Sequence, residues 1–364
     1  MAGVPIETVT ARAFAIPTDR PEADGTMSWD STTLVLVEIA AGAKSGIGYT
    51  YSDGSIVGLI VGTLASTVRG KDAMAPEAAW MAMQRTVRNL GREGLAASAI
   101  SAVDAALYDL KARFLDVPLV QLLGSYRRIV PIYGSGGFTS YSDAELAQQL
   151  GGWVADQGCK DVKMKVGSEP DLDPHRVRVA SRAIGEGANL FVDANGAYSV
   201  KQALQLADQF GEHGVRWFEE PVSSDDLEGL RAVRARAPAG MDVAAGEYAY
   251  TTDYVRAMLR CGAVDVQQTD ITRCGGVTGF LQIAALCEAH HIDLSGHCAP
   301  ALHLHAACAA PRLRHLEWFH DHVRIEHMLF EGAPMPRDGA IRPDLSRPGH
   351  GLTFKEADAA RYAI

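Results

Sequence analysis

The 364-residue sequence lacks several features that would place the protein in a membrane or outside the cell. It has no run of about twenty uninterrupted apolar residues, so no membrane-spanning segment is expected. Its first residues, MAGVPIETVTARAF, contain no basic segment followed by an apolar core, and we expect no secretory signal. The six cysteines form no C-x-x-C pair. This spacing predicts buried thiols in a reducing cytoplasm. It does not suggest a disulfide framework or a zinc site.

Positive charge is also scarce. The chain has 34 Lys and Arg residues against 44 Asp and Glu residues, which gives a formal net charge of −10. Neither a nucleic acid nor an anionic membrane is therefore expected as a partner. Hydrophobic residues make up 47% of the chain, enough for a sizeable core. A chain of this length could form either one large α/β barrel with a smaller domain or several small domains, and length alone does not favour either.

The first third of the chain differs from the rest. Residues 4–16 and 32–40 are expected strands, and the polar loop Thr18–Asp30 joins them. Helical apolar patterns follow near residues 55–69, 76–89 and 98–114. These elements predict a small α+β domain over residues 1–126.

From residue 127 onward, short apolar strands alternate with helices. Ser142–Glu145 and Ser199–Gln202 fit the capping-box pattern of a helix start. The eight expected strands are 129–134, 161–166, 189–195, 216–221, 242–247, 263–270, 293–298 and 316–319. This alternation predicts a closed (β/α)₈ TIM barrel over residues 127–325, with a tail, 326–364, that returns to the first domain. An open doubly wound sheet is the alternative, but GSGGF at 134–138 does not match the G-x-G-x-x-G phosphate turn.

Ionisable residues stand at the ends of strands two to eight, where a barrel carries its catalytic groups. They are Lys163, Lys165, Asp193, Glu219 or Glu220, Glu247, Asp270, His297 and Glu317. An acid at a single strand end is most often a solvated cap, so no one of these residues is decisive alone. Their regular occurrence on seven consecutive strands predicts an active site.

Three of the acids suggest a metal site. Asp193, Glu219 and Glu247 are separated by 26 and 28 residues, about one strand–helix unit each. Carboxylates on neighbouring strands repel one another unless a cation neutralises them. Hard oxygen ligands on rigid strands suit Mg²⁺. Glu220 is an alternative ligand to Glu219, and we expect Glu219 to point inward and Glu220 outward.

The two lysines and the histidine suggest acid–base chemistry. Lys163 and Lys165 lie two residues apart in a strand and therefore share a face. Close to each other and to a cation, each should lower the pKa of the other, so that a neutral amine can act as a general base. Asp270 is expected to orient the imidazole of His297. A base and an acid on different sides of a barrel that holds a metal suit removal of the proton α to a carboxylate.

Taken together, these motifs resemble the enolase superfamily, specifically its mandelate racemase subgroup. The ordered set is Lys163-Met164-Lys165, Asp193-Ala194-Asn195, Glu219-Glu220-Pro221, Gly246-Glu247, Asp270 followed by Gly275-Gly276, then His297, with Glu317 near the last strand. Residues 99–124 are similar to the segment that leads from the family's capping domain into the barrel. The resemblance implies a modified (β/α)₇β TIM barrel, capped by an α+β domain built from the N-terminal region and the C-terminal tail.

The resemblance also implies roles for individual residues. Asp193, Glu219 and Glu247 would bind one Mg²⁺. Lys165 would be the base on one face of the substrate, with Lys163 as its electrostatic helper and as a substrate-binding group. His297 and Asp270 would act on the other face, Glu317 would donate a hydrogen bond to the enolate, and Asn195 would bind substrate.

Specificity is expected from the loop Thr18–Asp30 and the turn Tyr49–Asp53, which should close over the barrel mouth. Trp29 and Tyr51 are the substrate-binding candidates in these segments, although lone aromatic residues more often only pack. His320 and His322 follow Glu317 closely, and we assign them to a polar loop instead of a second site.

These features favour a Mg²⁺-dependent lyase that dehydrates an aldonate or aldarate to a 2-keto-3-deoxy acid. A polar lid suits a polyhydroxylated substrate, and the subgroup members with both bases resemble acid-sugar dehydratases. The first alternative is a racemase or epimerase of a 2-hydroxy acid. A Schiff-base aldolase would leave the three carboxylates idle, and a non-catalytic binding protein would not need every ligand and base. We also expect a homo-oligomer with a small-molecule carboxylate as substrate.

Overall fold

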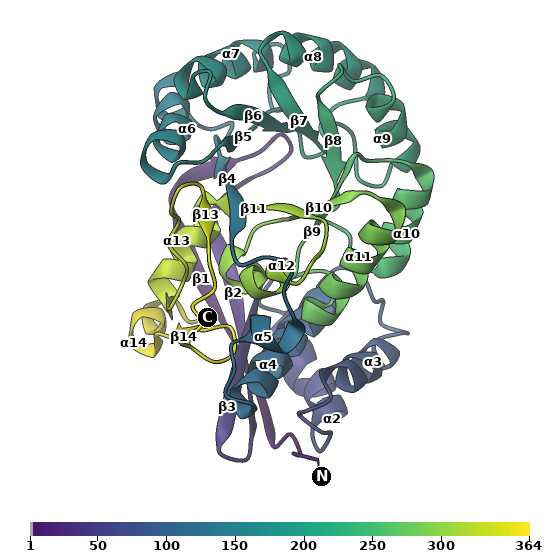
Figure 1. Cartoon of the computed structure of the whole chain (residues 1–364), viewed down its shortest axis with the longest axis vertical. Coiled ribbons are helices and arrows are strands. Elements are labelled where there is room, and N and C mark those ends of the chain that lie inside the picture. The colour runs from purple at the N-terminus through teal and green to yellow at the C-terminus, as the bar shows by residue number, and fades with distance from the viewer. Residues whose placement is uncertain (1–2) are drawn as a thin grey trace.

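A computed structural model describes residues 3–364, which form a barrel beside a smaller α+β domain (Figure 1). The smaller domain contains an antiparallel sheet in the order β1 (Thr8–Ala23), β2 (Ser28–Ala41) and β3 (Lys44–Tyr51). Its helical segments are α1 (Ile56–Leu59), a π-helical turn (Ile60–Leu64), α2 (Ala65–Val68), α3 (Pro76–Thr86) and α4 (Leu95–Phe114). Helix α4 is almost entirely buried because it packs against β2 and β3 on one side and the barrel on the other.

Eight parallel strands form the barrel. They are β4 (Val130–Gly136), β5 (Asp161–Lys165), β6 (Asn189–Asp193), β7 (Val215–Glu219), β8 (Asp242–Ala245), β9 (Val266–Thr269), β10 (Asp293–Gly296) and β11 (Leu313–Phe319). Strand β11 pairs with β4 from Leu316↔Ile132 to Phe319↔Ser135, which closes the sheet. The predicted TIM barrel is confirmed, and the open doubly wound alternative is wrong because this sheet has no parallel edge.

Seven helices connect the barrel strands. They are α6 (Asp143–Gln157), α7 (Asp173–Ile184), α8 (Val200–Glu212), α9 (Leu227–Arg234), α10 (Thr252–Cys261), α11 (Gly276–His290) and α12 (Pro300–Cys308). The short helix α5 (Leu119–Leu123) precedes β4, and α13 (His320–Leu329) follows β11 directly. Both predicted capping boxes are present, at Ser142 with Glu145 and at Ser199 with Gln202. His320 and His322 therefore lie in a helix, so their assignment to a loop is wrong.

Apolar side chains fill the inside of the barrel below its mouth. Tyr133, Phe191, Trp217, Ala244 and Val266 pack together there from five different strands. The rings of Phe191 and Trp217 stack with their centroids 5.1 Å apart. This plug forms a rigid floor beneath the side chains at the strand ends.

The C-terminal segment returns to the capping domain. Strand β12 (Phe330–Glu331) pairs with β14 (Thr353–Phe354), and β13 (Ala340–Ile341) pairs antiparallel with the start of β4. Near α14 (Glu356–Ala359), the Arg12 guanidinium of β1 lies 2.7 Å from the Glu356 carboxylate. The domain limits 1–126, 127–325 and 326–364 stay predictions.

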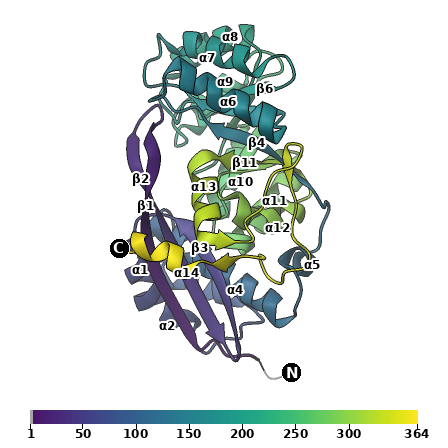
Figure 2. The ribbon, with the colours of Figure 1, turned by 90° about the vertical axis from the view of Figure 1, so that its left-hand side faces the viewer.

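The hairpin of β1 and β2 rises from the capping domain along the barrel (Figure 2). The segment Thr18–Asp30, expected as a loop, is largely strand, because Glu22↔Trp29 and Ala23↔Ser28 still pair after a register shift that begins at Pro17. At its tip, Gly25 approaches the barrel backbone so closely that a Cβ there would lie 2.6 Å from the Val166 carbonyl oxygen and 2.7 Å from that of Ala194. Only glycine fits this contact.

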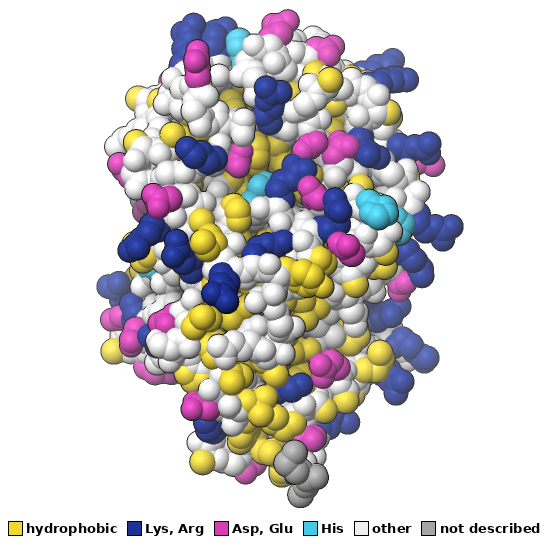
Figure 3. All heavy atoms as spheres, in the orientation of Figure 1, with side chains coloured by type: hydrophobic (Ala, Val, Ile, Leu, Met, Phe, Trp, Pro, Cys, Tyr) yellow, Lys and Arg dark blue, Asp and Glu magenta, His cyan; other side chains and the backbone are white. Residues whose placement is uncertain are grey.

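Two surface features complete the description. Within residues 3–364, the helices are too short or too polar to cross a membrane. Hydrophobic side chains gather over the lower half of the face seen in Figure 3, where α4, α5 and the tail lie. Exposed large apolar residues in the linker before β4 and in the tail include Tyr126, Ile129, Met335 and Leu345.

Candidate active site

Three carboxylates meet at the barrel mouth. Asp193 ends β6, Glu219 ends β7 and pairs in register with it, and Glu247 lies two residues beyond β8. One oxygen atom from each lies within 4.8 Å of the other two, and all three residues are buried. The structure thus brings together the three acids that the sequence spacing selected.

The two lysines of β5 point into the same cluster. Lys163 Nζ lies 2.5 Å from Glu219 Oε1 and 2.9 Å from Glu317 Oε1, and Lys165 Nζ lies 2.5 Å from Asp193 Oδ2. Between them, Met164 packs into the hydrophobic core outside the barrel. The alternation of a β-strand therefore explains the K-x-K spacing: both ammonium groups face the acids that neutralise them.

The charge balance sets the protonation of these lysines. Burial lowers the pKa of Lys165, but the nearby carboxylates, led by Asp193, outweigh burial and hold its pKa above the ordinary value. The expected lowering of the pKa by Lys163 is present but smaller. Within this set of side chains, Lys165 is therefore an ammonium. The base role requires a cation that offsets the carboxylates.

His297 and Asp270 form the second catalytic pair. His297 follows β10, and its Nδ1 lies 2.9 Å from Asp270 Oδ2, just beyond β9. Its Nε2 lies 3.2 Å from Glu247 Oε2, so the ring faces the three carboxylates. Burial opposes the charged form, yet the surrounding acids Glu247, Glu317 and Asp270 raise the pKa of His297 well above its ordinary value. The imidazolium form suits a general acid.

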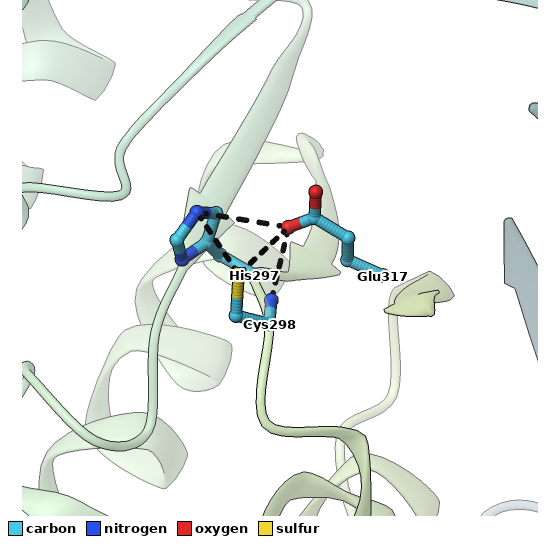
Figure 4. Close-up of side chains that lie close together, drawn as sticks. All are labelled: His297, Cys298 and Glu317. Atoms are coloured by element: carbon cyan, nitrogen blue, oxygen red, sulfur yellow. Dashed lines mark hydrogen bonds and ion pairs between the residues drawn. The ribbon is translucent and has the colours of Figure 1, made fainter. Parts of the chain in front are cut away.

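Glu317 and Cys298 lie beside this ring (Figure 4). Glu317 Oε2 accepts the backbone N–H of Cys298 at 3.0 Å, and Glu317 Oε1 accepts the hydroxyl of Ser135 at 2.6 Å. Burial would raise the pKa of Glu317, but the Lys163 and His297 charges lower it. Glu317 is thus an acceptor here, and its proposed donation to an enolate stays a prediction. The Cys298 thiol, 3.4 Å from His297 Nε2, has its pKa raised to about 12 by burial.

Several residues around the cluster were missed by the sequence reasoning. Trp217 Nε1 and Gln268 Nε2 donate to Glu219 Oε2 at 2.8 and 2.9 Å and fix that carboxylate. Arg273 lies 3.5 Å from both Glu247 and Asp270. Strand alternation places Trp217 on the same inward face as Glu219, but its hydrogen bond to that carboxylate was not foreseen. Arg273 follows its strand in an irregular segment, where no periodicity predicts direction.

Glu220 does not simply point outward. Its backbone φ is +37°, outside the extended range, so the strand ends before it. Its side chain is buried, and its Oε1 lacks a hydrogen-bond partner. Burial, and then the charge of Glu247, raise its pKa well above the ordinary value. The cluster of three acids nevertheless contains Glu219 and not Glu220.

The remaining candidates lie around the mouth. The Asn195 backbone N–H donates to Asp193 Oδ1 at 2.9 Å, while its side-chain oxygen is buried without a partner. Trp29 packs edge-on against Phe138, beyond β4, in a cluster that includes Cys298. Tyr51 stacks on His322 at a centroid distance of 3.5 Å. Trp29 therefore approaches the site more directly than Tyr51.

The donor set at the mouth fits Mg²⁺. It consists of oxygen ligands at the ends of three rigid strands, and Glu247 Oε2, although 3.2 Å from His297 Nε2, accepts no hydrogen bond. Burial, and then the charge of Asp193, raise the pKa of Glu219 to about 8. A divalent cation among these residues would favour the ionised form of all three acids.

Comparison with known proteins gives two family matches. Residues 7–124 match the mandelate racemase/muconate lactonizing enzyme N-terminal domain, and residues 145–358 match the enolase C-terminal domain-like family. A 3,6-anhydro-α-L-galactonate cycloisomerase of Streptomyces coelicolor is 34% identical, and the match covers 99% of each chain.

Solved structures agree with these matches. A mandelate racemase/muconate lactonizing enzyme-like protein from Rubrobacter xylanophilus is 51% identical, with a TM-score of 0.97 over 99% of this chain and 100% of that one. An L-talarate dehydratase from Polaromonas, in complex with Mg and L-glucarate, is 29% identical, with a TM-score of 0.90 over 99% of this chain and 97% of that one.

Proposed function

Because the chain belongs to the mandelate racemase/muconate lactonizing enzyme family of the enolase superfamily, we propose that it is a Mg²⁺-dependent acid-sugar dehydratase. The reaction would convert an aldonate or aldarate to a 2-keto-3-deoxy acid. The observation that carries the proposal is the arrangement of Lys165 and His297 on opposite sides of one carboxylate cluster. The names of its dehydratase and cycloisomerase relatives support a β-elimination.

The first step is removal of the proton on C2, α to the carboxylate. Asp193, Glu219 and Glu247 hold the metal in this proposal, and Lys165 Nζ, as the neutral amine, takes the proton. When bound, Mg²⁺ stabilises the negative charge that develops on the substrate carboxylate. Lys163 is held by Glu219 and Glu317 and adds a fixed positive charge at the same place.

The second step is loss of the C3 hydroxyl. His297 is placed for it as an imidazolium, with Asp270 fixing the ring through Nδ1 and Nε2 directed toward the carboxylate cluster. The hydroxyl departs with that proton as water, a C2=C3 double bond forms, and the resulting enol gains a proton at C3 to give the 2-keto acid. Lys165 thus removes a proton and His297 delivers one, while Lys163 contributes its charge.

Ring opening is the second candidate, favoured by the 34% identity to the cycloisomerase over 99% of both chains. In that reaction the leaving oxygen belongs to a cyclic ether at C3, so proton transfer by His297 opens the ring and no water is lost. The residues and the first step would be the same.

The hairpin tip is the proposed specificity element. Its docking on the barrel supports this role, since Thr139 donates its N–H to the Ala23 carbonyl at 2.9 Å and its hydroxyl to that of Asp24 at 2.8 Å. Trp29 packs from this hairpin against the cluster that contains Phe138 and Cys298. The polar residues on either side of Trp29 suit a hydroxylated chain.

We also propose that the protein is a cytoplasmic homo-oligomer that acts on a small carboxylate. Five of its six unpaired cysteines are buried, which suits a reducing compartment. The exposed apolar residues of the linker and tail support association with another copy. Light scattering on the purified protein would give the mass of the assembly.

The decisive experiment is a screen of aldonates, aldarates and 3,6-anhydro acids with Mg²⁺, followed by semicarbazide detection of the carbonyl product. Dehydration predicts a 2-keto product that is lighter than its substrate by one water, about 18 Da. Ring opening predicts a keto product of unchanged mass. EDTA should abolish either reaction, and Mg²⁺ should restore it. Inversion of a 2-hydroxy acid without any keto product would contradict both candidates, and a borohydride-trapped substrate adduct would indicate a Schiff base.

A further inference from the structure

A further group of potential metal-binding side chains, distinct from those at the strand ends, lies where the β1–β2 hairpin meets the start of α13. Asp19 and Glu22 come from β1, in the segment where the register shifts, and His320 is the first residue of α13. One donor atom from each of the three lies within 4.8 Å of the other two. His320 Nε2 lies 3.0 Å from Asp19 Oδ2. Asp19 and His320 are 301 residues apart in the chain, so the two segments meet only in the folded protein.

Two buried carboxylate oxygens at this place lack hydrogen-bond partners. Glu22 is fully buried; its Oε2 accepts the Trp29 indole N–H at 2.8 Å, but its Oε1 has no partner. Asp321 is also fully buried, and its Oδ2 is unpartnered while its Oδ1 accepts from Arg324. A buried carboxylate oxygen without a donor costs free energy, which coordination of a cation would recover.

The basic groups nearby do not supply the missing partner. Arg324 is engaged by Asp321 and by the carbonyl of Pro17. Arg20 forms an ion pair with Glu145 of α6. Negative charge is therefore in excess around Glu22.

The group is reachable from solvent. Asp19, Arg20 and His320 line a hollow of about 320 Å³, together with Tyr141 and residues of α6. Their side chains are part-exposed, whereas Glu22 forms the buried end of the set. A hydrated ion could thus enter from the hollow and exchange water for carboxylate and imidazole ligands.

We propose that Asp19, Glu22 and His320 bind a divalent transition-metal ion of the Zn²⁺ type, separate from the Mg²⁺ of the active site. One imidazole nitrogen with two carboxylate oxygens suits Zn²⁺, whereas Mg²⁺ prefers oxygen ligands alone. Three protein ligands leave a position for water from the hollow. The ion joins the hairpin to the barrel, and through Glu22 it fixes the orientation of Trp29.

The test counts Zn²⁺ bound to full-length protein by equilibrium dialysis and elemental analysis. Zn²⁺ can also occupy the active-site carboxylates, so an Asp193→Asn/Glu247→Gln variant isolates the second site. We expect two equivalents in the wild type, one in this variant and one in His320→Ala. The combined variant should bind none. His175→Ala is the matched control, because His175 forms a 2.7 Å pair with Asp143 on the surface but belongs to no three-ligand cluster; it should keep both equivalents.

Hydrogen exchange gives a readout independent of catalysis. In the Asp193→Asn/Glu247→Gln background, Zn²⁺ should slow amide exchange in residues 17–30, and His320→Ala should remove that protection. Asp19→Asn, at a part-exposed position, tests the same site if His320→Ala fails to fold. Absence of bound Zn²⁺ in the Asp193→Asn/Glu247→Gln variant, or protection of residues 17–30 that survives both substitutions, would overturn the proposal. Neither result depends on whether the enzyme is a dehydratase.

Discussion

Two sets of buried acids in this molecule have opposite surroundings. At the strand ends, Glu317 faces Lys163, and Asp270 faces His297 and Arg273. At the interface between the capping domain and the barrel, Asp104 of α4 accepts from the backbone N–H and hydroxyl of Thr278 in α11, at 2.9 and 2.8 Å. Glu326 of α13 similarly accepts the hydroxyl of Tyr49 in β3 at 2.6 Å.

The difference lies in the charge of the partners. Burial raises the pKa of every one of these acids, but positive neighbours reverse the shift at the strand ends and lower the pKa of Glu317 and of Asp270. Neutral donors cannot do so at the interface, where burial raises the pKa of Asp104 and of Glu326 to about 8. Glu317 and Asp270 are therefore ionised and available for chemistry, whereas Asp104 and Glu326 are protonated near neutral pH and join two domains.

The largest effect expected at the strand ends is loss of the acid or base itself. Lys165→Ala and His297→Asn should each reduce turnover on the order of 10⁴-fold, because each removes a proton-transfer group. His297→Asn should still exchange the C2 proton with deuterium from solvent, since Lys165 remains, and NMR in D₂O would detect that exchange. Lys160→Ala is the control, because this lysine is exposed just before the same strand; it should keep wild-type turnover. Full activity of Lys165→Ala would refute its role as base.

A smaller loss should follow when only the partner of His297 is changed. Asp270→Asn keeps the size of the side chain but removes the charge that orients the imidazole. We expect kcat to fall about 10²-fold with little change in KM, because the ring remains but is held in the wrong tautomer. Steady-state kinetics would measure both constants. If Asp270→Asn matched the wild type, the ion pair would be structural, like the contacts of the interface set.

The sequence predicted the strand-end set well because strand periodicity and spacing determine it. Lys163 and Lys165 share a face by alternation, and Asp193, Glu219 and Glu247 follow at the length of a strand–helix unit. The capping boxes at Ser142 and Ser199 fixed the register between them. Such local rules depend only on neighbouring residues, which is why the barrel could be inferred before any contact was known.

The same rules could not predict contacts between distant segments. The hairpin tip looked like a loop because its residues are polar and Gly25 interrupts it, whereas cross-strand pairing and docking on the barrel make it a strand. The positive φ of Glu220 depends on where β7 ends. The meeting of Asp19 with His320, and of Asp104 with Thr278, depends on domain packing that no periodicity encodes.

The smallest expected effect concerns the interface set and its pH dependence. The folded-state pKa of Asp104, about 8, lies above the ordinary value of 3.8, so the folded protein keeps a proton that the unfolded chain releases. The stabilisation that this acid contributes is therefore complete below pH about 4 and is lost as the pH rises towards about 8.

Asp104→Asn retains an oxygen acceptor for the Thr278 N–H but has no proton to lose. The free energy of unfolding of the variant, relative to the wild type, should therefore increase with pH, by at most about 1.4 kcal/mol per pH unit. Urea unfolding between pH 5 and about 8 measures this difference, and Asp171→Asn, at an exposed position, should run parallel to the wild type. A parallel profile for Asp104→Asn as well would mean that Asp104 is ionised in the folded protein, and the contrast between the two sets of acids would be lost.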